Sequence, residues 1–341
     1  MIREAIEKVV AGVDLTRDEA VAVMEEIMTG QATPAQFGAL VTALRLKGET
    51  VEEIAGFATV MRRLATPVCP RRPVVDTCGT GGDGRGTFNI STTAAFVAAG
   101  AGAVVAKHGN RSMTSLCGSA DVLEALGVNI ALGPAQVEAC LEQIGIGFMF
   151  AQLFHPAMKF AAGPRREIGI RTVFNILGPL TNPAGAHAQV LGVASPALVT
   201  RMAEALTLLD THHALVVHGQ DGVDEISICA PTMVSEVRDG EIRSYIIQPE
   251  DLGFDRASPE DIRGGDAATN AAITRSVLQG ANGPRRAVTL LNAAAALVAS
   301  DLAEDLAEGV QLAARSIDSG AAADRLDRLI TLTRSFATAS A

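Results

Sequence analysis

Aromatic residues and an excess of positive charge are what this sequence most clearly lacks. Its 341 residues include no Trp and one Tyr, and 28 Lys and Arg stand against 38 Asp and Glu, a formal net charge of -10 at pH 7. Nucleic acid and anionic lipid are usually bound by basic surfaces, and single strands also by stacking of bases on aromatic rings. The composition therefore argues against general binding to nucleic acid or to an anionic membrane.

Paired cysteines and long apolar runs are also scarce. The five cysteines are odd in number, scattered and without a Cys-x-x-Cys pair, so we interpret them as reduced thiols. The adjacent His212 and His213 do not have the spacing of a structural zinc site. The longest apolar run, AAFVAAGAGAVVA, is shorter than the roughly 20 residues of a membrane span, and MIREAIEKVVAG lacks the apolar core of a signal peptide. We expect a cytoplasmic protein that does not associate with membranes.

Two kinds of local pattern divide the chain. Three capping boxes precede apolar residues at helical spacing: TRDE, TPAQ and TVEE, which begin at Thr16, Thr33 and Thr50. They predict a small all-helical domain over residues 1–65, and the prolines of TPVCPRRP indicate a linker over 66–73. Over 74–341, short β-rich runs alternate with helical ones. This pattern predicts a larger α/β domain whose central sheet is mostly parallel and flanked by helices. The runs EISICAPTMVSEV and EIRSYIIQ, which RDG separates, suggest two antiparallel strands added to it.

The small domain contains only a few short helices. Such a thin layer buries its apolar faces against the rest of the chain or against a second copy. We therefore predict a homodimer.

A glycine loop stands between a predicted strand and a predicted helix. In GTGGDGRGTFNIST, five glycines fall between Gly79 and Gly86. Glycine lets backbone amides approach an anion, and a helix N-terminus favours negative charge. A Walker A loop is excluded because no Lys-Ser or Lys-Thr follows its second glycine, and the GxGxxG pattern lacks an acidic ribose partner because residues 85–120 contain no Asp or Glu. A glycine turn without a ligand is the remaining alternative.

A second polar segment, KHGNRSMTSLCGSAD from Lys107 to Asp121, follows the next predicted strand. It is rich in basic, amide and hydroxyl side chains. The carboxyl ends of parallel strands meet at one edge of a sheet, which is the usual ligand crevice of α/β folds. Two polar loops at that edge favour a phosphate site over a turn without a ligand.

Together with GSADVLEALG, FHPAMK, RTVFNILGPLTNP and VHGQDGVDEIS, these two segments resemble the anthranilate phosphoribosyltransferase family over nearly the full chain. The resemblance implies transfer of the phosphoribosyl group from phosphoribosyl pyrophosphate to the amine of anthranilate, with release of pyrophosphate, in tryptophan biosynthesis. It implies Mg2+ as cofactor and a homodimer formed through the small domain. It also implies hinges between the two domains, with helices around 155–180 packing on the small one.

The resemblance further implies roles for individual residues. Phosphoribosyl pyrophosphate would be bound by Gly79, Gly82, Asp83, Thr87, Asn89, Ile90, Ser91, Thr92, Lys107, His108, Gly109, Asn110, Arg111, Ser112, Met113, Thr114, Ser115 and Ser119. Anthranilate would be bound by Gly79, Asn110, His155 and Arg165, and magnesium by Ser91, Asp224 and Glu225. No dedicated acid or base is expected, because an arylamine is already neutral at pH 7 and needs placement more than deprotonation.

Several alternatives stand beside these assignments. From the residues alone, Asp224 and Glu225 are as well explained as solvated acids as they are as magnesium ligands. Arg165 is likewise as well explained as half of a surface ion pair with its neighbour Glu167. A pyrimidine nucleoside phosphorylase-like enzyme would use free phosphate without magnesium, and a non-catalytic nucleic-acid-binding relative would need a basic groove. The chain also departs from the family pattern at Leu116, where many relatives carry a basic residue, and at Gly163, where proline is usual.

Overall fold

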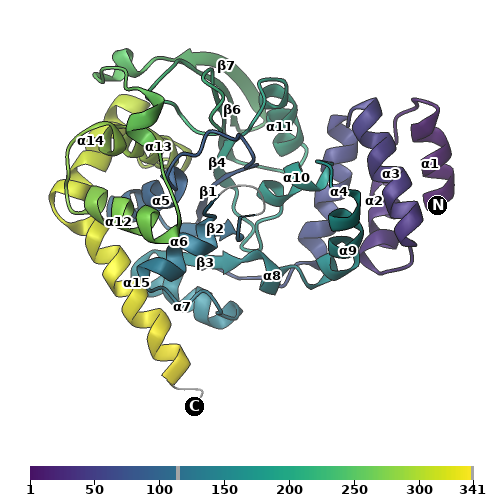
Figure 1. Ribbon diagram of the computed structural model, residues 1–341, viewed down its shortest axis with the longest axis horizontal. Coiled ribbons are helices and arrows are strands. Elements are labelled where there is room, and N and C mark those ends of the chain that lie inside the picture. The colour runs from purple at the N-terminus through teal and green to yellow at the C-terminus, as the bar shows by residue number, and fades with distance from the viewer. Residues whose placement is uncertain (113–115, 339–341) are drawn as a thin grey trace.

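The computed structural model describes residues 1–112 and 116–338. Its N-terminal helices gather at one end of the molecule (Figure 1): α1 (Ile2–Val10), α2 (Arg17–Met28), α3 (Pro34–Lys47) and α4 (Val51–Leu64). The N-caps of α2, α3 and α4 are Thr16, Thr33 and Thr50, and each makes the reciprocal pair of hydrogen bonds of a capping box. The three helix starts predicted from the sequence are thereby confirmed.

A seven-stranded sheet forms the centre of the larger part of the chain. Its strands are β1 (Val75–Gly79), β2 (Val105–Gly109), β3 (Ile146–Phe150), β4 (Ala188–Gly192), β5 (His213–Gly219), β6 (Thr232–Arg238) and β7 (Glu241–Ile247). The order is β3-β2-β1-β4-β5-β6-β7, with the first five parallel and the last two added antiparallel. The predicted fold class, a helical N-terminal domain followed by a mostly parallel α/β domain, is confirmed.

The other helices follow the N-terminal ones along the chain, and several of them pack on the sheet. They are α5 (Ile90–Gly100), α6 (Ser119–Leu126), α7 (Pro134–Ile144), α8 (Ala151–Phe154), α9 (Lys159–Ile168), α10 (Phe174–Leu177), α11 (Ala197–Thr207), α12 (Ala267–Leu278), α13 (Pro284–Ala299), α14 (Leu306–Asp318) and α15 (Ala321–Thr338). Short 3-10 turns occur at Pro156–Met158, Gly178–Leu180, Pro249–Leu252 and Pro259–Ile262. Across residues 1–112 and 116–338, no helix combines the length and apolar character needed to cross a membrane.

Successive residues of the central strands belong to two different cores. On β5, Leu215 and Val217 pack with the core that contains α5, α13 and α15, whereas Ala214 and Val216 pack with the core that contains the N-terminal helices and α11. Strand side chains point alternately to opposite faces, so each core covers one face of the sheet. The N-terminal helices therefore share continuous apolar packing with the sheet.

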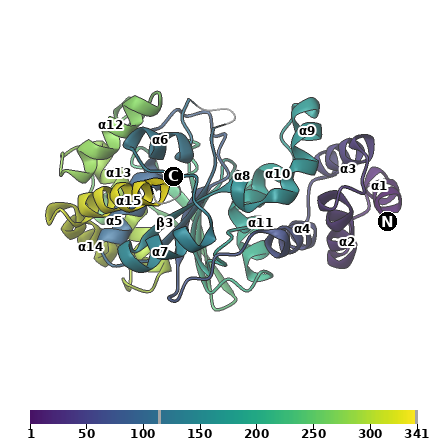
Figure 2. The same cartoon turned by 90° about the horizontal axis from the view of Figure 1, so that it is seen from below.

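The segment that carries α9 and α10 lies against the N-terminal helices (Figure 2). Helix α9 contacts α2 and α3, and α10 contacts α4. Phe37 of α3 and Phe174 of α10 stack with ring centroids 5.3 Å apart. Arg62 of α4 donates hydrogen bonds to the carbonyl oxygens of Leu180 and Leu209 at 2.6 and 3.0 Å. Residues 159–180 are thus attached to the helical end of the molecule.

Two histidines lie at the amino-terminal end of β5, each between two carboxylates. His212 places Nδ1 2.9 Å from Asp239 Oδ1 and Nε2 2.8 Å from Asp301 Oδ2. His213 lies 2.8 Å from Glu236 and 3.2 Å from Asp301. The hydrogen bond with Asp301 is the main reason that the pKa of His212 is raised above its usual value. The His212 imidazolium therefore links β5, β6 and the turn after α13.

Replacing His212 by Gln is expected to destabilise the protein more in mild acid than in mild alkali. A pKa raised in the folded state contributes stability below the unfolded value, near 6.5, and that contribution is lost as pH rises through the folded value. Because the side chain is 46% exposed, the effect should stay below about 1 kcal/mol. Thermal unfolding midpoints at about pH 5.5 and 8.5 measure it.

His187→Gln is the matched control, because His187 faces a backbone carbonyl oxygen, that of Asp210, rather than a carboxylate. A loss at His212 that is the same at both pH values, or larger in alkali, would contradict the explanation.

Candidate active site

Loops from several strands meet at the carboxyl edge of the parallel sheet. The residues predicted to bind phosphoribosyl pyrophosphate, the donor of the phosphoribosyl group, lie on two of these loops. After β1 these are Gly79 at the end of the strand, Gly82, Asp83 and Thr87 in the loop, Asn89 as N-cap, and Ile90, Ser91 and Thr92 in the first turn of α5. The second group begins in the last residues of β2, which are Lys107, His108 and Gly109. It continues with Asn110, Arg111 and Ser112 after the strand and with Ser119 at the start of α6. Met113, Thr114 and Ser115 fall outside the described residues.

The loop after β5 brings the predicted acid pair to the glycine loop. The amide of Gly81 donates to Asp224 Oδ2 at 2.8 Å, and the amide of Ser91 donates to Glu225 Oε1 at 3.1 Å. The two acids thus contact the glycine loop and the first turn of α5, although about 140 residues separate them in sequence. Both side chains are half-buried and accept hydrogen bonds from backbone amides, which argues against the alternative that they are freely solvated acids.

Asp224 lies above two neighbouring glycines of the sheet. Gly79 of β1 and Gly192 of β4 are partners in the strand register. A Cβ added to Gly79 would lie 2.5 Å from Asp224 Oδ2, and one added to Gly192 would lie 1.6 Å from the Asp224 carbonyl oxygen. The absence of a side chain at Gly79 and Gly192 therefore lets the loop that carries Asp224 and Glu225, here called the acid loop, approach the edge of the sheet. Sequence analysis assigned no role to Gly192; a glycine at the end of a strand was its only signal.

Four glycines of the loop have left-handed backbone conformations. The φ angles of Gly81, Gly82, Gly84 and Gly86 are 64°, 73°, 70° and 67°. L side chains rarely adopt such angles, so the loop could not follow this path with other residues. Its carbonyl groups at Gly81 and Gly82 accept hydrogen bonds from Arg171, a residue that sequence analysis did not single out.

Three half-buried carboxyl groups, those of Asp83, Asp224 and Glu225, meet at this place. Burial raises the pKa of Asp224, and the charge of Asp83 raises it further; burial and then the charge of Asp224 do the same for Glu225. Asp83 Oδ2 is buried and has no hydrogen-bond partner in the described part of the chain. Raised carboxyl pKa values and an unpaired carboxylate oxygen mark a place that a cation would stabilise. Magnesium suits this donor set, since it prefers oxygen and usually takes one or two carboxylates together with waters and phosphates.

Within residues 1–112 and 116–338, no three His, Cys, Asp or Glu side chains are grouped so that they could hold a metal by themselves. Asp224 and Glu225 would therefore share the ion with phosphate oxygens.

The N-terminus of α5 lies next to these acids. Asn89, its N-cap, makes no side-chain cap bond to the described helix. Its side chain instead donates to the carbonyl oxygen of Cys117 at 3.3 Å and accepts from Asn270 at 2.9 Å. In this conformation the Ile90 amide donates to the carbonyl oxygen of Phe88 at 2.7 Å and the Ser91 amide donates to Glu225, so the positive end of the helix dipole faces a carboxylate, the kind of group that it favours.

Lys107 is directed into the sheet. Its side chain is buried, and Nζ donates to the carbonyl oxygen of Thr77. Burial raises the pKa of Asp76, and the charge of Lys107 offsets part of that rise. The Asp76 carboxyl group also accepts from the His108 amide at 3.2 Å and the Asn182 side chain at 2.7 Å. In this conformation Lys107 therefore balances buried negative charge beneath the loops.

The rest of the loop after β2 is held by acids of α6. Arg111 pairs with Asp121 at 3.0 Å and also with Glu124. The Ser112 amide donates to Asp121 Oδ2 at 3.1 Å, and Ser119 Oγ donates to the Asn110 carbonyl oxygen at 3.3 Å. These contacts position the predicted binding loop, and in this conformation the Arg111 guanidinium is engaged by carboxylates. Leu116 is exposed.

Two buried histidines lie side by side: His108 on β2 and His155 at the end of α8. The ring centroids of His108 and His155 are 5.0 Å apart. Burial lowers the pKa of His108 to about 3 and that of His155 to about 4, so both rings are neutral near pH 7. The Nε2 atom of each has no partner among the described residues. Two neutral rings packed together make an apolar, aromatic wall beneath the loop that follows β2.

Arg165 of α9 lies over the Phe174 ring, with its guanidinium carbon 5.3 Å from the ring centroid. Burial lowers its pKa. It forms no ion pair within the described residues, so the predicted alternative of a surface pair with Glu167 is wrong. A half-buried arginine without a carboxylate partner is suited to bind a carboxylate ligand.

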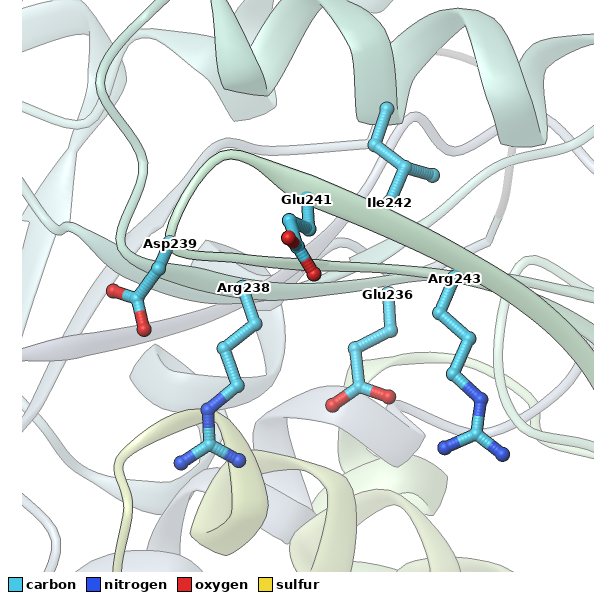
Figure 3. Close-up of a pocket in the computed structure, with 6 residues that line it drawn as sticks. All are labelled: Glu236, Arg238, Asp239, Glu241, Ile242 and Arg243. Atoms are coloured by element: carbon cyan, nitrogen blue, oxygen red, sulfur yellow. The ribbon is translucent and has the colours of Figure 1, made fainter.

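A separate hollow of about 470 Å³ lies over the β6–β7 hairpin (Figure 3). It is lined by Glu236, Arg238, Asp239, Glu241, Ile242 and Arg243. In Figure 3 the side chains of Arg238, Glu236 and Arg243 extend from the same face of the hairpin. Glu236 already pairs with His213, and Arg238 with Asp301. Its charges thus offset one another, and the loops at the sheet edge are the stronger candidate site.

Comparison with known proteins finds matches over nearly the full chain. Residues 3–65 match the model of the glycosyl transferase family helical bundle domain, and residues 71–323 match that of the glycosyl transferase family a/b domain. The chain is 64% identical to the anthranilate phosphoribosyltransferase of Chloroflexus aggregans over 98% of both chains. Its fold is similar to the crystal structure of that enzyme from Thermus thermophilus, with TM-score 0.92, 46% identity and coverage of 97% and 99%. It is also similar to the Saccharomyces cerevisiae enzyme in complex with PRPP and Mg, with TM-score 0.89, 28% identity and coverage of 98% of both chains.

Proposed function

Because the chain belongs to the anthranilate phosphoribosyltransferase family, we propose that it transfers the phosphoribosyl group of phosphoribosyl pyrophosphate to the amine of anthranilate. The observation that carries the proposal is the meeting of Asp224 and Glu225 with the amides of Gly81 and Ser91 at the start of α5. That junction combines anion-binding amides with carboxylates for a cation. A substrate with two phosphate groups and bound magnesium needs both.

The donor would lie along the glycine loop and the first turn of α5. Gly82, Asp83 and Asn89 to Thr92 would surround the pyrophosphate, and the loop after β2 would complete the phosphate and ribose contacts. Ser91, Asp224 and Glu225 would hold magnesium, which when bound neutralises charge on the departing pyrophosphate. The unpaired Oδ2 atom of Asp83 and the raised pKa values of the acid pair support this placement.

The acceptor would lie between α9 and the end of β2. Arg165 would bind the carboxylate of anthranilate, while His155, Asn110 and the backbone of Gly79 would contact the ring and its amine. The neutral state of His155 and its packing against His108 support contact with an aromatic ring.

The reaction would be a displacement at the anomeric carbon of the ribose. The amine nitrogen forms the new bond, the bond to the pyrophosphate oxygen breaks with its electron pair, and the amine loses one proton to water. The backbone amides of the glycine loop and α5 stabilise the oxygens on which charge grows, an effect worth about 3 kcal/mol per donor in other enzymes. Alignment of the two substrates supplies the rest, so no dedicated acid or base is required.

Mixing the purified protein with anthranilate, phosphoribosyl pyrophosphate and magnesium tests the proposal. Anthranilate fluorescence should fall with time, and removal of magnesium with EDTA should stop the fall. Incubation with a pyrimidine nucleoside and phosphate tests the nucleoside phosphorylase alternative. Phosphorolysis of the nucleoside without consumption of anthranilate would overturn the proposed reaction.

A cytoplasmic homodimer formed through the helical domain is proposed for the assembled protein. Met1, Val10, Val13 and Leu46 expose large apolar side chains on the outer helices, between 48% and 84% of their surface. Such apolar surface is suited to a second copy of the chain. Sedimentation should therefore give twice the chain mass, and Leu46→Asp should shift it toward the single chain; a monomeric wild type would refute the dimer.

A further inference from the structure

Arg171 joins two parts of the candidate site that are distant in sequence. It lies in the connection between α9 and α10. Its Nη2 atom donates to the carbonyl oxygen of Gly81 at 3.1 Å, and Nη1 donates to that of Gly82 at 3.4 Å. One planar guanidinium therefore holds two consecutive carbonyl groups of the glycine loop.

The backbone around Arg171 is anchored to the helical end of the molecule. Thr172 and Val173, the next two residues, are buried, and Val173 belongs to the core of the N-terminal helices. The Thr172 amide donates to the Asn175 side chain at 2.9 Å, which shapes the start of α10. Arg165, the proposed anthranilate ligand, lies on α9, directly before this connection. Arg171 and Arg165 are thus carried by one short segment.

On the other side, the glycine loop is held at adjacent groups. The amide of Gly81 donates to Asp224, while its carbonyl oxygen accepts from Arg171. At Gly82, where φ is +73°, an added Cβ would lie 1.7 Å from Arg171 Nη1. The bare backbone of Gly82 therefore admits the guanidinium, and the loop lies between the acid pair and the arginine.

We propose that Arg171 is a positioning residue that locks the glycine loop to the α9–α10 segment. Through it, the loop that receives the donor phosphates is set by the same segment that carries Arg165 for the acceptor. The inference rests on the proposed function for the identity of the two substrates. Arg171 acts here through the loop backbone, and it is distinct from the residues proposed to contact the substrates.

Arg171 contributes little to the stability of the fold. Its side chain is exposed and its partners are backbone oxygens of the exposed Gly81 and Gly82, where water competes for both. Loss of the side chain should therefore leave the protein folded but free the loop to leave the geometry that the donor requires. Lysine, a single flexible donor, can reach one of the two carbonyl groups but not bridge both in a plane.

The test compares Arg171→Ala and Arg171→Lys with Arg166→Ala. Arg166 is an exposed arginine of α9 that forms no hydrogen bond or ion pair in the described part of the chain. Three quantities are measured: kcat and KM for each substrate, the Kd of the magnesium complex of phosphoribosyl pyrophosphate by calorimetry, and the thermal midpoint. Arg171→Ala should raise the donor KM and Kd about tenfold, with kcat changed less and the midpoint within about 2 °C of wild type. Arg171→Lys should recover part of the affinity, and Arg166→Ala should match wild type.

The possible outcomes distinguish the positioning role of Arg171, here called the lock, from the proposed reaction. An unchanged donor Kd in Arg171→Ala, an equal change in Arg166→Ala, or a loss of affinity accompanied by a large fall in the midpoint would overturn the lock. If the wild type binds the donor but does not consume anthranilate, the proposed reaction fails while calorimetry still reports on Arg171. If the wild type does not bind the donor at all, both are overturned.

Discussion

Replacing Asp224 by Asn and Glu225 by Gln together is expected to reduce kcat/KM by at least about a thousandfold while leaving the protein folded. A metal ion that stabilises a charged leaving group contributes several kcal/mol, and about 4 kcal/mol corresponds to three orders of magnitude in rate. The amide side chains keep an oxygen that can accept from Gly81 and Ser91, so the hydrogen bonds that shape the site are retained. Only the charges that would bind magnesium are lost.

The same variant is expected to be at least as stable as the wild type without metal. The pKa values of both acids are raised by burial, so their ionised forms cost stability at neutral pH. A raised thermal midpoint in the variant, together with loss of turnover, would separate the metal role from a structural one. The matched control removes two exposed acids, Asp255→Asn with Glu241→Gln, and should retain full activity. Turnover of the Asp224 and Glu225 variant near the wild-type rate would refute the metal site.

Gly192→Ala is expected to reduce activity by about a hundredfold or more, although Gly192 would touch neither substrate. Its Cβ would lie 1.6 Å from the Asp224 carbonyl oxygen, where the backbone of the acid loop must move. Displacement of a positioned group by about 1 Å can cost two orders of magnitude in rate. Gly79→Ala would place its Cβ 2.5 Å from Asp224 Oδ2, so it would displace the carboxylate itself and is also expected to lower activity.

Steady-state rates over a range of magnesium concentrations measure this effect, and Gly192→Ala should need more magnesium for half-maximal rate. Gly133→Ala is the control, because its Cβ would have no neighbour nearer than 4.0 Å. Activity of Gly192→Ala within a few fold of wild type would show that the position of the acid loop does not depend on the absence of a side chain at Gly192.

Local patterns predicted the elements whose hydrogen bonds close within a few residues. The capping boxes at Thr16, Thr33 and Thr50 determine where α2, α3 and α4 begin, because each box satisfies amides of its own first turn. The alternation of β-rich and helical runs predicted the parallel sheet and the antiparallel hairpin at its edge.

One predicted strand was wrong at its start. EISICAPTMVSEV suggested a strand from Glu225, whereas β6 begins at Thr232. In the residues before it, Asn292 of α13 takes the place of a neighbouring strand: it accepts from the Ile226 amide and donates to the Ile226 carbonyl oxygen, both at 2.9 Å. A side chain about 66 residues away therefore satisfies backbone groups whose local pattern is that of a strand.

The sequence by itself determined the kind of protein and most of the candidate ligands of the site. The glycine loop, the polar loop after β2 and the acid pair are runs of adjacent residues, so their composition is visible along the chain. Only the tertiary structure decided how these runs meet. Gly192 matters because β4 pairs with β1, and Arg171 matters because its segment packs on the N-terminal helices and reaches back to the glycine loop. Such contacts depend on packing between elements distant in sequence, which no local pattern encodes.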